Sequence, residues 1–139
     1  MLYTIKTDGK KYAYDSASGA VLHINNLQHK MLGTIVPPIS PASLSSLRYE
    51  LAKFDSSDIS DAFDEIYALA KDGLLYAEDD GVIRLVASGE YACPNETVAS
   101  ALLTKALKGK SEATFVTVGD GDFSSIAQKV AETTGTKLS

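Results

Sequence analysis

Cysteine is nearly absent, because the 139-residue chain contains only Cys93. One thiol cannot form a disulfide within the chain, and it cannot supply the several cysteines of a zinc or iron–sulfur site. No histidine is near Cys93 in the sequence, so we interpret it as a buried thiol rather than a nucleophile. His23 and His29 lack the paired spacing of a helical metal site. We therefore expect no metal, no cofactor and no catalytic residue.

Positive charge and long apolar runs are also in short supply. The chain carries 13 Lys and Arg against 18 Asp and Glu, a net charge of −5, which disfavours nucleic acid as a partner. No window approaches the apolar run of about 18 residues expected of a membrane helix. The first residues alternate as a strand does rather than forming a signal peptide. We expect a cytoplasmic protein without a membrane partner.

The negative charge is concentrated in the first part of the chain. Residues 1–80 hold 12 acidic and 7 basic residues (12 − 7 = 5 negative), whereas residues 81–139 hold 6 of each. A shift in composition of this kind is typical of a domain boundary. We predict a domain at residues 1–80 and a smaller unit at residues 81–139.

The first 24 residues have the pattern of three short antiparallel strands. Tyr12 and Tyr14 alternate with small or polar neighbours, as in a half-buried strand. The dipeptide Asp8-Gly9 favours a tight hairpin before them. Residues 15–19 have turn chemistry and lead to a third strand at residues 21–24. Together these segments predict a three-stranded meander.

Three helices are expected after the meander. The first follows a cap at Asn25 or Asn26, the second opens with Ser40 as its cap, and the third is capped by Ser56 or Ser57. The third has one apolar face, with acidic residues largely off that face. The predicted fold class is α+β and winged-helix-like, with the meander followed by a three-helix bundle.

Several short motifs occur here in a familiar order. They are Tyr14-Asp15-Ser16-Ala17-Ser18-Gly19-Ala20-Val21, Met31-Leu32 leading to Pro37-Pro38-Ile39-Ser40, Asp58-Ile59 with Asp64-Glu65-Ile66, and Asp72-Gly73-Leu74-Leu75-Tyr76-Ala77-Glu78-Asp79-Asp80. With this order and spacing, residues 1–80 resemble the PqqD-like RiPP recognition element. The resemblance is greatest to the element at the N-terminus of radical-SAM maturases that form thioethers in SCIFF-type peptides.

The resemblance implies a peptide-binding module that has no catalytic activity of its own. Such a module captures the leader of a ribosomally synthesised precursor peptide by β-strand addition and presents it to a radical-SAM maturase. The leader would lie beside the third strand, with apolar side chains in a cleft against the third helix. Acidic residues along this helix would favour a Lys-rich leader. The peptide-binding residues implied are Val21, Leu22, His23, Ile24, Ile59, Phe63, Ile66 and Tyr67.

Simpler roles are open for the same residues. Half of the third strand must face the core because strands alternate, and Ile59, Phe63 and Ile66 fit a core stripe. Tyr67 lies off that stripe and is the better candidate for a groove contact. The alternative function is a winged-helix DNA-binding or protein-interaction domain. A DNA-reading helix would need basic residues, and the third helix carries acids instead.

The chain departs from the maturases in one respect. Their radical-SAM barrel is announced by a CxxxCxxC triplet, whereas Cys93 stands alone here. The maturase must then act in trans, or the chain is a divergent or fused product, or it is a fragment.

Residues 81–139 predict a small α/β appendage of unknown role. Strands are expected at residues 82–86 and 114–118, with a helix at about residues 95–108 and a second helix after Asp122. The loop at residues 119–122 precedes a helix, but its two aspartates repel anions and no lysine follows. We interpret this loop as a turn with a helix cap rather than a nucleotide site.

Overall fold

The computed structural model describes all of residues 1–139 and confirms a mixed α+β chain with five helices. The strands are β1 (Leu2–Thr7), β2 (Lys10–Asp15), β3 (Val21–Ile24), β4 (Val82–Val86), β5 (Glu112–Val118) and β6 (Lys137–Leu138). The helices are α1 (Asn26–Thr34), α2 (Ser43–Glu50), α3 (Ser56–Lys71), α4 (Glu96–Leu107) and α5 (Ser124–Thr134). None of these helices combines the length and apolar character needed to span a bilayer.

The predicted meander is confirmed as an antiparallel sheet in the order β1-β2-β3. Asp8 and Gly9 both have positive φ, at 53° and 73°, which suits the tight primed turn between β1 and β2. Tyr14 pairs with Tyr3 on one side and with Val21 on the other. The middle strand is therefore fully paired, and β1 and β3 are the two edges.

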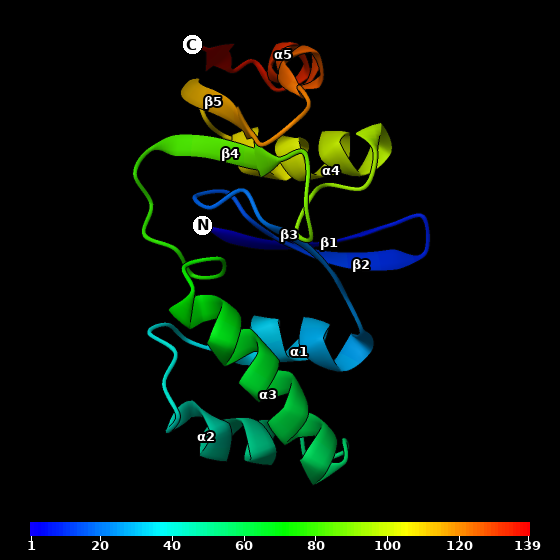
Figure 1. The fold of residues 1–139 in the computed structure, drawn as a ribbon, viewed down its shortest axis with the longest axis vertical. Coiled ribbons are helices and arrows are strands. Elements are labelled where there is room, and N and C mark those ends of the chain that lie inside the picture. The colour runs from blue at the N-terminus through cyan, green and yellow to red at the C-terminus, as the bar shows by residue number, and fades with distance from the viewer.

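The second sheet is parallel, in the order β4-β5-β6. Parallel neighbours need crossover connections, and α4 and α5 supply them. The two helices pack against each other (Figure 1). The predicted strand at residues 82–86 is confirmed, and the predicted 114–118 strand begins two residues earlier, at Glu112.

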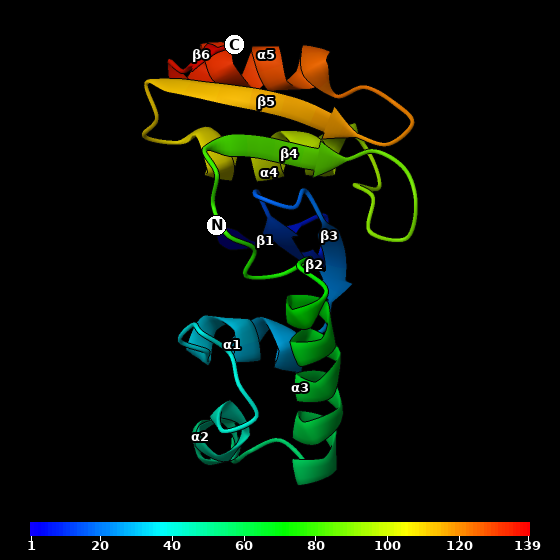
Figure 2. The same cartoon turned by 60° about the vertical axis from the view of Figure 1, so that its left-hand side comes forward.

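The meander is the middle layer of the molecule. It lies between α1, α2 and α3 on one side and the β4–β6 sheet with its helices on the other (Figures 1 and 2). One face contributes Tyr12, Tyr14 and Val21 to a core of 16 buried residues, here called the α4 core. The other contributes Ala13 and Ile24 to a core of 13 buried residues, here called the α3 core.

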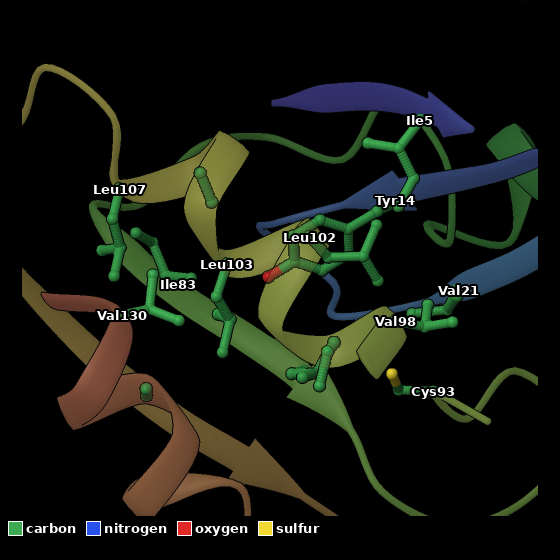
Figure 3. Packing of buried hydrophobic residues seen from close by; sticks show 14 of the residues in the cluster. Ile5, Tyr14, Val21, Ile83, Cys93, Val98, Leu102, Leu103, Leu107 and Val130 are labelled. Atoms are coloured by element: carbon green, nitrogen blue, oxygen red, sulfur yellow. The ribbon is translucent and has the colours of Figure 1, made fainter. Parts of the chain in front are cut away.

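The α4 core joins the two halves of the chain. Figure 3 shows the Tyr14 side chain reaching from the meander among residues of α4 and β4. Leu85 and Leu102, at the centre of this core, are fully buried. A domain boundary between residues 80 and 81 stays a prediction. The α4 core contains residues from both sides of that position in the sequence.

Two of the predicted helix starts are wrong. Helix α2 begins at Ser43 rather than after Ser40, because the Ser40 carbonyl accepts from the Ser43 amide in a preceding turn. Helix α3 is capped by Asp55, whose carboxylate accepts from both the amide and the hydroxyl of Ser57. A carboxylate only accepts hydrogen bonds, which makes it the stronger cap beside two serines.

Candidate functional site

Strand β3 is positioned by a buried carboxylate. Asp15 is fully buried, and its Oδ1 accepts from the amides of Ala17 (2.9 Å) and Ser18 (3.2 Å). Its Oδ2 accepts from the amide of Ala77 (3.0 Å), in the segment that follows α3. Three donors satisfy the carboxylate and fix the turn that delivers the chain into β3.

The far end of β3 is fixed by a capping box. The Asn25 side chain accepts from the Gln28 amide at 2.8 Å, and the Gln28 side chain accepts from the Asn25 amide at 2.9 Å. This reciprocal pair satisfies two backbone donors at the start of α1. The strand is therefore clamped at both ends although it is only four residues long.

The side chains of β3 alternate between the two cores. Val21 is buried in the α4 core, and the exposed His23 ring lies on the same face, with its centroid 5.5 Å from that of Tyr12. Ile24 is buried in the α3 core, and the half-buried Leu22 packs against it. Val21, Leu22 and Ile24 thus have core contacts, and only His23 extends into solvent.

Hydrogen bonds show which backbone groups of β3 point outward, away from β2. Its only strand partner is β2. The Val21 amide donates to the Tyr91 carbonyl at 2.9 Å, so it points away from β2. Because amide directions alternate along a strand, the Leu22 amide points toward β2 and the His23 amide points outward. The outward groups available to an added strand are therefore the carbonyl of Val21 and the amide and carbonyl of His23.

Tyr91 lies in residues 87–95, the loop that joins β4 to α4. In both views this loop descends to the side of β3 (Figures 1 and 2). The half-buried Tyr91 side chain packs against the α3 core. Its pKa is raised by burial and by the charges of Glu90, Asp72 and Glu65. The last two belong to the α3 region, on whose core the ring packs.

The four α3 residues predicted for the cleft wall lie in the α3 core or pack against it. Ile59, Phe63 and Ile66 are 1%, 3% and 3% exposed and belong to the α3 core. Tyr67 stacks on Phe63 with ring centroids 5.7 Å apart, and the Lys71 ammonium lies 5.5 Å from the Tyr67 centroid.

Glu65 shows which flank of α3 is near β3. Its Oε2 accepts from Gln28 Nε2 at 3.3 Å, at the start of the helix that follows β3. Residues two apart on a helix differ in direction by about 200°. Tyr67 therefore points away from the flank that carries Glu65, and its contact with a guest peptide stays a prediction. Sequence reasoning missed Tyr91, which is 70 residues from Val21 in the chain.

The outer edge of β4 is occupied by residues 16–19. The Arg84 amide donates to the Ser16 carbonyl at 2.8 Å, and the Val86 amide donates to the Gly19 carbonyl at 3.0 Å. The Arg84 side chain donates to the Ala17 carbonyl at 2.6 Å. The Tyr14 hydroxyl donates to the Arg84 carbonyl. The meander thus seals this edge with both backbone and side-chain bonds.

Cys93 and the 119–122 loop, the other positions considered from the sequence, have structural roles. Burial raises the pKa of the Cys93 thiol to about 11, which keeps it protonated and poorly nucleophilic. In the 119–122 loop, the Asp120 amide donates to the Ser88 hydroxyl, and Asp122 accepts from the Ser124 amide. No group of three or more His, Cys, Asp or Glu side chains converges as a metal site would require.

No protein-family model matches the chain, and a search of curated proteins found no match either.

Proposed function

We propose that the chain is a peptide-binding module that captures the leader of a ribosomally synthesised precursor peptide by β-strand addition. In this proposal residues 1–80 act as a winged-helix-like recognition element, and a radical-SAM maturase acting in trans carries out the chemistry. The observation that carries the proposal is the outer edge of β3, where the His23 amide and carbonyl point away from β2.

Backbone pairing alone gives this edge only modest affinity. Each hydrogen bond contributes about 1 kcal/mol net, and His23 offers one donor and one acceptor. The rest of the affinity must come from guest side chains that enter the space between β3 and α3. This division of labour is usual for strand addition, in which backbone bonds provide a platform and pockets provide selectivity.

Charge along α3 favours a basic guest. Asp58, Asp61 and Glu65 lie on the flank that borders the end of β3, and they line a concavity together with Asn25 and Leu27. The α3 flank offers carboxylates without a basic residue among these lining groups. A Lys-rich leader would therefore be steered toward the β3 edge, and the effect would weaken as salt is added.

The proposal is tested by selecting peptides of about ten residues, long enough to pair along β3, from a random displayed library on the immobilised chain. The best sequence is synthesised with a fluorescent label and titrated by anisotropy. We expect a Kd at or below about 100 μM, a generous limit for strand addition. Failure of every selected peptide to bind at that concentration would contradict the proposal.

Two variants of His23 locate the docking strand. His23→Pro removes the outward amide but leaves the β2–β3 pairing intact, because proline is tolerated where an edge N–H faces solvent. We expect this variant to lose peptide binding. His23→Ala keeps the amide and removes the ring, and it should retain binding. Equal affinity for the wild type and His23→Pro would place the peptide elsewhere.

A further inference from the structure

The loop at residues 87–95 makes one of the backbone hydrogen bonds that an added strand would make. The Tyr91 carbonyl accepts from the outward Val21 amide at 2.9 Å, which is a strand-addition hydrogen bond formed within one chain. The Tyr91 ring leaves the same backbone position and packs against the α3 core. We propose that Glu90, Tyr91 and Ala92 occupy the guest's place, and that the leader which displaces them carries an aromatic residue at the position of Tyr91. This inference rests on the proposed function.

The Tyr91 ring is the part of this segment that contacts the α3 core. Val21 is 4% exposed and Ile24 is 7% exposed, so the side chains of β3 are already packed inward. Beside the edge, the half-buried Tyr91 ring is held by its apolar packing on the α3 core. A flat aromatic side chain fills such a site at a low cost in conformational entropy. A guest with an aliphatic or polar residue there would leave the same apolar surface less well covered.

The surrounding charges limit what the guest can carry next to its aromatic residue. Glu65 and Asp72 lie close enough to raise the pKa of the Tyr91 hydroxyl, together with Glu90 of the loop itself. An acidic guest residue would place a further negative charge beside these carboxylates. A Lys or Arg at the position of Glu90 would instead be attracted to both α3-flank carboxylates. The favoured guest is therefore a basic peptide with one aromatic anchor.

The loop at residues 87–95 is held weakly enough around Tyr91 to move away from the β3 edge. Gly89 and Glu90 are exposed, and Gly89 has a φ of 97° with open space where a Cβ would lie. Within the loop the Ala92 amide reaches the Gly89 carbonyl only at 3.4 Å. The firm anchor comes after the segment, where the Cys93 amide donates to the Val86 carbonyl at 2.8 Å. Tyr91 can therefore move out while β4 and α4 stay in place.

The test uses a synthetic peptide with the sequence of residues 87–95 in which Ser replaces Cys. It is titrated into ¹⁵N-labelled full-length Tyr91→Ala, and the backbone amide signals of Val21 and His23 are followed by NMR. We expect saturable shifts at both amides in this variant. The wild type should show at least about a tenfold weaker response, because its tethered copy competes at an effective concentration in the millimolar range. Absence of shifts in the variant, or equal shifts in the wild type, would overturn the inference.

Two controls make the result specific. A peptide with Ala at the Tyr91 position should give no shifts, which shows that the ring is required. Tyr91→Phe keeps the ring in the protein and should exclude the peptide as the wild type does. If Tyr91→Ala fails to fold, Tyr91→Leu retains apolar cover and is tested in its place, with the same expected order of binding.

The outcome separates this inference from the proposed function. If library-selected leaders bind the wild type and Tyr91→Ala equally well, the leader does not displace Tyr91 and the inference fails while the proposed function stands. If the 87–95 peptide binds Tyr91→Ala but no selected leader binds either protein, the intramolecular guest is real and the proposed function fails.

Discussion

The outer edges of β3 and β4 differ in how firmly they are covered. Two backbone hydrogen bonds from residues 16–19, the Arg84 side chain and the Tyr14 hydroxyl all hold the β4 edge. The β3 edge is met by a single backbone hydrogen bond, from Val21 to Tyr91. Exposed edges invite pairing with other chains, so proteins usually cover them. One edge of this molecule is sealed as part of the fold, and the other is covered by a loop that we propose a guest peptide displaces.

The difference follows from what each covering segment is attached to. Residues 16–19 are held by the buried Asp15 carboxylate and by backbone bonds to Arg84 and Val86. Tyr91 lies in a loop whose Gly89 and Glu90 are exposed. Weakening the hold of residues 16–19 on β4 should therefore destabilise much of the molecule. Removing the Tyr91 side chain should change stability little and should mainly open the β3 edge to an added peptide.

The largest effect is expected from removing the carboxylate behind the sealed edge. Asp15→Ala leaves the amides of Ala17, Ser18 and Ala77 without their acceptor. We expect the free energy of unfolding to fall by about 3–4 kcal/mol in urea titrations, because buried unpaired amides are costly. Asp15→Asn keeps an oxygen for two of these donors and should lose about half as much. Equal losses in the two variants would mean that the Ala17 and Ser18 bonds add nothing, and that the charge and the Oδ2 bond to Ala77 account for the whole effect.

The next largest effect is expected at the close approach of the two sheets. Gly19 has a φ of 84°, and a Cβ on it would lie 3.0 Å from backbone and Cβ atoms of Arg84 and Leu85. Gly19→Ala should cost about 3 kcal/mol from backbone strain and the close contact together. Gly73→Ala is the matched control, since Gly73 has a φ of 76° with nothing within 4 Å. It should cost about 1–2 kcal/mol, and a loss as large as that of Gly19→Ala would show that the close contact is unimportant.

A smaller effect is expected from the hydroxyl that crosses between the sheets. Tyr14 is fully buried, and its hydroxyl donates to the Arg84 carbonyl. Tyr14→Phe should lower the free energy of unfolding by about 1–2 kcal/mol, because the carbonyl then loses its side-chain partner. Tyr12→Phe, at the neighbouring position on the same face, is the control and should be close to neutral. An unchanged free energy of unfolding in Tyr14→Phe would mean that the bond from Tyr14 to Arg84 does not help to hold the meander on β4.

The smallest effect on stability is expected at the cover of β3. Tyr91→Ala removes a half-buried ring and should cost about 1 kcal/mol or less in the same urea titration. The slope of the titration should not change, since no large surface is newly exposed in the folded state. A loss as large as that of Asp15→Ala would mean that the two edges are covered with equal firmness.

Local sequence patterns predicted the meander well. Alternation at Tyr12 and Tyr14 and the Asp8-Gly9 turn are short-range signals, and the observed register follows them. Residues 15–19 were identified as a turn from Asp, Ser and Gly alone, and the structure confirms that Asp15 accepts from amides two and three residues ahead. Signals of this kind depend only on neighbours in the chain, which is why sequence suffices for them.

The contacts that define the candidate site are long-range and were not predictable. Val21 and Tyr91 are 70 residues apart in the chain, and no local sequence pattern at either residue indicates that they are in contact. The position of Tyr67 off the apolar stripe of α3 predicts a contact with the guest peptide. The stripe has two borders, however, and only one of them lies near the end of β3. The border nearer β3 is the one with Glu65, as shown by its bond to Gln28. Which border faces a strand depends on how the helices pack, and helical periodicity does not contain that information.

Hydrogen exchange at three backbone amides tests the central claim most directly. The Val21 amide is bonded to the Tyr91 carbonyl, whereas those of Arg84 and Val86 are bonded to residues 16–19. The account predicts that Val21 exchanges through a local opening, far faster than the other two and with little dependence on urea. Arg84 and Val86 should exchange only with global unfolding. If Val21 exchanges as slowly as Arg84 and with the same urea dependence, the β3 edge is sealed as firmly as the β4 edge and the account is contradicted.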